Sequence, residues 1–310
     1  MIFHWLFIII LSYFFFSVAA FGDKLILSGF SGKRVKFEET DPALYTFFVG
    51  VLNILIVVFI PFFGLPLPTW GTHVWIILEA LTMVLSLYFL YSAVQSFEVS
   101  KVVPVIGAFQ PIFVFILSFL LFGTALLQPY ALAIFVLLIA GSMFISFEEK
   151  FHATKKFLVL TVGAAALFSL EYVFSKLVFL NMDFVHGLIW MRIWSFVFAM
   201  LLLSIPKLRK RIFAKKPMAS KKTSLGFVAF QTMGALAGLL QNWAVALVPV
   251  GYLAIMNSLR GLQYLFLFFI AVSFSHFLPA IFKERITQKA IINKSIGIFM
   301  IILGMIFLVV

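Results

Sequence analysis

Long apolar stretches alternate with short polar or proline-containing breaks along the whole sequence. A helix needs about 20 apolar residues to cross the hydrocarbon core of a bilayer, and ten stretches are of this order. Proline and glycine lie in several of the breaks, where turns are expected. The pattern predicts an all-α integral membrane protein with ten transmembrane helices and no hidden soluble domain. The predicted spans are 3–22, 43–62, 73–95, 102–122, 127–147, 157–179, 184–205, 224–247, 251–278 and 291–310.

Composition excludes several classes of protein. Of the 310 residues, 64% are hydrophobic and 11% are charged, whereas about a quarter of a soluble chain is charged. A soluble enzyme, a secreted disulfide scaffold and a disordered protein are therefore ruled out. With no cysteine, the chain has no thiolate zinc site, iron–sulfur cluster or cysteine nucleophile. No histidine has a second ligand at helical spacing and no Walker-type loop is present, so we expect no metal, no cofactor and no direct use of ATP.

The basic residues predict an orientation. Twenty of the 23 Lys and Arg residues lie in or beside the odd-numbered connections, and the even-numbered connections hold none. By the positive-inside rule, the odd connections are cytoplasmic and both termini face outward from a plasma (inner) membrane. The basic run 207–222 is expected to contact anionic lipid rather than nucleic acid.

The sequence also repeats itself. A shift of 151 residues places Ala93-Val94 on Ala244-Val245, and the small-residue motif at 137–147 matches 300–310. The openings 19–29 and 171–181 match more loosely, and an Asp precedes the next helix in each half. We expect two units, 1–150 and 151–310, of five helices each. Because five is odd, the two units must be inverted relative to each other, as in many secondary transporters.

Two segments resemble a known family. KVVPVIGAFQPIFVFILSFLLFG (101–123) and KERITQKAIINKSIGIFMIILG (283–304) are similar to the drug/metabolite transporter superfamily, EamA-type, with Glu284 and Arg285 in the family's acidic and basic places. The resemblance implies a transporter whose helices at 102–122 and around Arg260 line a central cavity. The chain departs from the family at Gly123-Thr124, where Glu is usual. The family is also usually drawn with cytoplasmic termini, opposite to the Lys/Arg count.

Ionisable residues inside spans are costly and mark candidate sites. Arg192 and Arg260 are expected about 12 Å below the outward face, from a rise of about 1.5 Å per residue. Glu171 reaches a similar level, so the three side chains are predicted to meet in one layer with one surplus positive charge. An anionic or zwitterionic substrate would supply the partner. Alternatively, Glu171 and Arg192 form a structural ion pair. As the only deep carboxylate identified, Glu171 is also the candidate for proton coupling.

Other polar residues in the spans are weaker candidates. Lys176 and Glu79 lie near helix ends, where a lysine can snorkel to the interface and the glutamate would be structural or gating. The remaining predicted substrate-binding residues are Gln110, Asn257, Tyr264 and Trp243, with Gln241 and Asn242 as further cavity lining; Trp190 and Trp194 fit either a lipid belt or a cavity wall.

The sequence thus favours a secondary transporter that moves a small polar metabolite, amino acid or organic anion-like, by alternating access. A hydrophobic or lipid-linked cargo carried by the same fold is the alternative. A membrane-embedded transferase is less favoured because no two Asp residues lie within four positions of each other. A non-transporting scaffold also remains open. The expected partners are the small-molecule substrate and membrane lipids, not nucleic acid; a monomer suffices, and a dimer stays possible.

Overall fold

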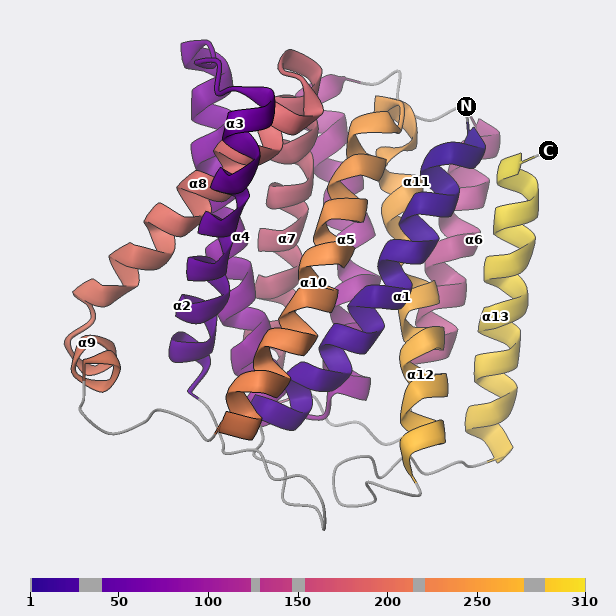
Figure 1. Ribbon diagram of the computed structural model, residues 1–310. Coiled ribbons are helices and arrows are strands. Elements are labelled where there is room, and N and C mark those ends of the chain that lie inside the picture. The colour runs from indigo at the N-terminus through magenta and orange to yellow at the C-terminus, as the bar shows by residue number, and fades with distance from the viewer. Residues whose placement is uncertain are drawn as a thin grey trace.

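The computed structural model describes residues 2–27, 41–123, 129–146, 154–213, 221–275 and 288–309 (Figure 1). Within these ranges all regular structure is helical. The α-helices are α1 Ile2–Leu27, α2 Pro42–Leu52, α3 Ile60–Phe63, α4 Trp70–Ser96, α5 Val99–Phe122, α6 Pro129–Ser146, α7 Lys155–Asn181, α8 Phe184–Leu201, α9 Pro206–Ile212, α10 Lys221–Leu247, α11 Leu253–Ser258, α12 Gly261–Ser275 and α13 Gln288–Val309. The 3₁₀ segments are η1 Asn53–Phe59, η2 Leu202–Ser204 and η3 Val250–Tyr252.

Among the described residues, eight stretches are long and apolar enough to cross a membrane, which confirms an all-α, multi-pass membrane protein. They are His4–Leu27, Pro42–Phe63, Trp70–Ser96, Lys101–Phe122, Lys155–Asn181, Phe184–Ser204, Thr223–Leu247 and Val250–Ile270. Two shorter apolar helices, Pro129–Phe144 and Ser295–Leu308, occupy the positions of the fifth and tenth predicted spans. The chain termini lie at the same end of the bundle (Figure 1).

Polar side chains fix where several helices begin. Asp41 accepts hydrogen bonds from the backbone N–H groups of Ala43 and Leu44 at the start of α2. Asp183 accepts one from Val185 at the start of α8. Such side-chain oxygens satisfy backbone donors that have no partner within the helix. The second and seventh predicted spans therefore each begin with an Asp cap.

Two spans are not continuous α-helices. The second passes from α2 through η1 into α3, and the ninth is interrupted between α11 and α12. At that interruption the Arg260 N–H bonds to the Asn257 carbonyl, and the Gln263 N–H bonds to the Arg260 carbonyl. These i to i+3 bonds tighten the chain into a turn. No proline lies at this point, and the ninth span was predicted to be continuous.

Helices from the two halves pack directly on each other. α1 lies along α10, α4 along α7, and α6 against α13 (Figure 1). Glycines allow the last of these contacts, because a Cβ at Gly141 would stand 2.9 Å from the Gly297 carbonyl oxygen. Residues 284 and 285, which carry part of the family resemblance, lie outside the described residues, as do His152 and His276.

Candidate functional site: a cavity within the membrane spans

A cavity of about 710 Å³ lies between helices of the two halves. Most of its lining is apolar and comes from α1, α2 with η1, α4, α7, α8 and α10. Among the described residues, four charged ones reach it: Asp23, Glu171, Arg192 and Arg260. Its size is within the range typical of small-molecule sites. Its other polar lining residues are Asn53, Tyr91, Gln231, Thr232, Gln241, Asn242 and Gln263.

Arg260 is positioned by the break in the ninth span. Its Nε donates to Gln263 Oε1 at 3.1 Å, and its Nη1 donates to Gln110 Oε1. The guanidinium carbon lies 5.5 Å from the centre of the Phe168 ring, within the range of cation–π contact. The side chain is thus held on three sides while its residue, 8% exposed, lines the cavity.

Glu171 and Arg192 also line the cavity, so the structure brings together the three residues that the sequence placed in one layer. The alternative of a direct Glu171–Arg192 ion pair is wrong: within the described part of the chain, Glu171 has no ion pair within 4.0 Å. Both arginines still interact with it electrostatically. Arg192 Nη1 contacts the sulfur of Met83, a weak acceptor. Glu171 and Arg192 therefore leave charge facing the cavity.

Asp23 is a cavity carboxylate that sequence analysis missed. It is 7% exposed, and Oδ1 accepts from Tyr45 Oη at 2.5 Å and from Gln231 Nε2 at 2.9 Å. Both donors are neutral. The expectation that Glu171 is the only deep carboxylate is wrong, because Asp23 sits at the end of a long helix and not in a loop. With Asp23 included, the cavity lining has two acids and two arginines and no surplus charge.

Glu79 is buried in the interior rather than near an interface. It is fully buried, and Ser175 Oγ lies 3.5 Å from its Oε1 at the contact of α4 with α7. Arg192 and Glu171 are its charged neighbours. Glu79 does not line the cavity, so it acts on the site only through these neighbours.

Lys176 does not snorkel to the interface. Its Nζ donates to the carbonyl oxygens of Val245, Ala246 and Val248, at 3.0, 3.1 and 2.7 Å. These carbonyls end α10, where the helix has no backbone donors left for them. The lysine is 3% exposed and works as a structural cap.

Lys24 makes the same kind of contact at the end of α4. Its Nζ donates to the carbonyls of Val94 and Phe97, at 2.8 and 2.7 Å. The sequence placed Lys24 in the first connection, and the packing of α1 against α4 draws it inward.

The other predicted site residues lie around the cavity rather than in it. Gln110 does not line the cavity, but its Oε1 accepts a hydrogen bond from Arg260 Nη1. Asn257 and Tyr264 are buried without reaching the cavity, and Trp243 is 45% exposed on the outside of α10. Gln241 and Asn242 do line it.

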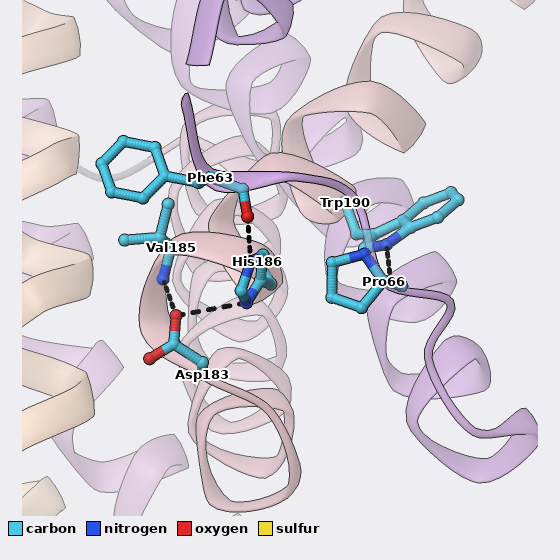
Figure 2. A network of polar contacts seen from close by, with 6 residues as sticks. All are labelled: Phe63, Pro66, Asp183, Val185, His186 and Trp190. Carbon is cyan, nitrogen blue, oxygen red and sulfur yellow. Dashed lines mark hydrogen bonds and ion pairs between the residues drawn. The ribbon is translucent and has the colours of Figure 1, made fainter. Parts of the chain in front are cut away.

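Polar contacts join the end of α3 and the α3–α4 connection to α8 (Figure 2). His186 Nε2 is 2.9 Å from the Phe63 carbonyl, and Trp190 Nε1 donates to the Pro66 carbonyl at 2.9 Å. His73 packs edge-on against Trp190 and Trp194. Trp190 and Trp194 thus belong to this end contact, and neither lines the cavity.

Comparison with known proteins shows the fold alone. No family model matches the chain, and no curated protein matches it. Among solved structures, 27 chains match. One crystal structure of a protein superposes with a TM-score of 0.64, covering 96% of this chain and 97% of its own, at 14% sequence identity. The arrangement of helices therefore occurs, at nearly full length, in a solved structure of very different sequence.

Proposed function

We propose that this protein is a secondary transporter of the drug/metabolite type that moves a small amino acid or organic anion-like metabolite by alternating access. The observation that carries the proposal is Arg260, held at a break in a membrane-spanning helix and facing a cavity shared with Glu171. Interrupted helices near the midplane are where secondary transporters bind substrates and ions. The protein would work in the plasma (inner) membrane as a monomer, with both termini outward.

The packing supports ten spans arranged as two inverted repeats, 1–150 and 151–310. Exchanging the halves turns the α1–α10 contact into the α7–α4 contact, and both are extensive in the structure. The contact of α6 with α13 maps onto itself. In this arrangement α6 and α13 are the fifth and tenth spans, although their apolar stretches, Pro129–Phe144 and Ser295–Leu308, are shorter than the other spans.

The two buried lysines support the same repeat. Lys24 on the first helix of one half caps the end of α4, and Lys176 on the first helix of the other caps the end of α10. The capped positions Val94 and Val245 are 151 residues apart, the shift that aligns the sequence with itself. A polar contact reproduced at equivalent positions is hard to obtain from chance similarity of apolar helices.

The charges facing the cavity support the substrate class. Arg192 and Arg260 can bind a carboxylate by charge-assisted hydrogen bonds, and Glu171 can receive an ammonium group. Because neither Glu171 nor Arg192 has an ion-pair partner within 4.0 Å in the described chain, a zwitterion would satisfy both. The apolar remainder of the lining accommodates a hydrophobic side chain.

The test is thermal stability of the purified protein against a panel of amino acids, organic acids, sugars and cationic drugs. A ligand that binds only the folded state raises its melting temperature. We expect a rise with zwitterionic or anionic compounds and its loss in Arg260→Ala, because losing charged hydrogen bonds costs about 1.5–3 kcal/mol, roughly 10- to 100-fold in affinity.

The control variant is Arg209→Ala, which removes an arginine from α9, outside the cavity. It should keep the full ligand-induced shift. A shift that survives in Arg260→Ala would remove this arginine from the site, and a panel without any stabilising compound would count against a carrier of soluble metabolites.

A further inference from the structure

The lining of the cavity includes apolar side chains that are also exposed on the outside of the bundle. Leu55 on η1 is 62% exposed, and Val228 and Leu239 on α10 are 51% and 41% exposed. A residue that lines the cavity and is also exposed on the outer surface of the bundle marks an opening between the two. These three lie on facing walls, one on η1 and two on α10, so the opening runs between the second and eighth spans.

The opening is at membrane level. Leu55 and Leu239 each precede the end of their span by eight residues. At a rise of about 1.5 Å per residue this is about 12 Å, close to the middle of a hydrocarbon core about 30 Å thick. At this depth the opening leads into lipid and not into water.

Chemically, the opening favours hydrocarbon. Thr232 Oγ1 donates to the Val228 carbonyl at 2.8 Å, and Asn53 Nδ2 donates to the Val49 carbonyl at 3.4 Å. The Thr232 hydroxyl and the Asn53 amide thus donate to carbonyl groups of their own spans. The charged groups Glu171, Arg192 and Arg260 lie in the same cavity on the helices behind.

The equivalent interface in the other half is closed. Under the proposed repeat, α2–α10 corresponds to α8–α4, and α8 packs along α4, where His73 meets Trp190 and Trp194. In the described chain α2 and α10 meet at one end, where Tyr45 and Phe48 pack on the Phe227 ring and Gln231 bonds to Tyr45. Farther along the same two spans, Leu55 and Leu239 stay exposed. The 3₁₀ turn of η1, a feature common at hinges, lies in the wall that would have to move.

We propose that the cavity opens sideways into the bilayer between α2 and α10 and that its substrate is a single-chain amphiphile with a zwitterionic headgroup. The headgroup lies among Glu171, Arg192 and Arg260, and the hydrocarbon tail leaves through the opening past Leu55 and Leu239. This inference rests on the proposed transport function and adds a hydrocarbon tail to the zwitterionic group that the same charged residues would bind.

The experiment uses the full-length protein in phosphatidylcholine vesicles with a lysophosphatidylethanolamine that carries a photoreactive group in its tail. We expect cross-links concentrated at the η1 and α10 walls and displaced by unlabelled lysophosphatidylethanolamine. Leu239→Trp and Leu55→Trp each place a bulkier side chain in the opening. Each should reduce the displaceable labelling about tenfold, equivalent to about 1.4 kcal/mol. Both positions are exposed, so the folded core is untouched.

The matched control is Leu120→Trp on α5, which is 70% exposed and does not line the cavity; its labelling should stay unchanged. Labelling spread evenly over the apolar surface, or equal in Leu239→Trp and wild type, overturns the lateral opening. Melting temperatures measured with O-phosphoethanolamine, which has a zwitterionic headgroup and no tail, and with the soluble panel distinguish this inference from the proposed transport function. Binding of a soluble compound without lysolipid displacement overturns this inference and leaves the transporter standing, whereas binding of neither overturns both.

Discussion

At the residue scale, the same side chain type plays opposite parts depending on what packs beside it. Lys24 and Lys176 donate to carbonyl groups at the ends of neighbouring helices. Arg260 instead bonds to Gln110 and Gln263, and its residue lines the cavity. From the sequence, Lys24 was placed in a connection, Lys176 near an interface and Arg260 in a candidate site. Their partners come from helices distant along the chain, so only the packed structure separates a structural cation from a candidate binding residue.

The cap at Lys176 leads to a stability prediction. Lys176→Met leaves three carbonyls at the end of α10 without this donor, and each unpaired buried group costs about 1–3 kcal/mol. We expect a melting temperature several degrees below wild type, measured in detergent. Lys24→Met, with two carbonyls, should have a smaller effect in the same direction.

Lys156→Met serves as the comparison, because the Lys156 ammonium donates to Ser96 Oγ in an exposed setting. Its melting temperature should match wild type. If Lys176→Met is equally neutral, the capping role is wrong.

At the element scale, close helix contacts depend on glycine. A Cβ at Gly141 would lie 2.9 Å from both the Gly297 carbonyl oxygen and Ile301 Cγ1, so α6 and α13 can approach only without it. Sequence analysis matched the small-residue motifs in the last helix of each half as part of the repeat. It could not show that the two motifs face each other.

Gly141→Val is expected to force α6 and α13 apart. Overpacking of this kind costs about 1–3 kcal/mol, so thermal unfolding should occur at a lower temperature. Gly71→Val is the control, since a Cβ there meets no atom within 4 Å. Equal unfolding temperatures for the two variants would mean that the α6–α13 contact adjusts without loss.

The break in the ninth span is an element that sequence reasoning did not find. The segment around Arg260 stood out for its polar residues, and Asn257, Ser258 and Gly261 are residue types common at helix ends. Sequence analysis nevertheless assigned one continuous span there. The turn between α11 and α12 is accompanied by tertiary contacts of Arg260 with Gln110 on α5. A local pattern has no access to a partner 150 residues away.

At the scale of the whole molecule, orientation can be tested directly because the chain has no cysteine. Leu67, between α3 and α4, and Phe213, after α9, are 85% and 70% exposed. Helices α3 and α9 lie at opposite ends of the bundle (Figure 1). In intact cells, a membrane-impermeant maleimide should label Leu67→Cys and not Phe213→Cys, as the Lys/Arg distribution requires. Labelling of Phe213→Cys alone would establish the reverse orientation, with both termini cytoplasmic.

The sequence by itself determined the fold class and the positions of the helices. Spans are specified locally, because about 20 apolar residues in a row have no stable place except across a bilayer. It also pointed to Glu171, Arg192 and Arg260, since an ionisable residue in such a run is costly enough to stand out. These signals need no knowledge of neighbouring helices.

Tertiary structure decided what each polar residue does. Asp23 became part of the cavity through Tyr45 and Gln231, Lys176 became a cap of α10, and Trp243 was left on the outside. In hydrocarbon, hydropathy cannot tell an inward face from an outward one, because lipid and protein interior are equally apolar. Which face of each helix turns inward is set by the packing of helices, and with it the site.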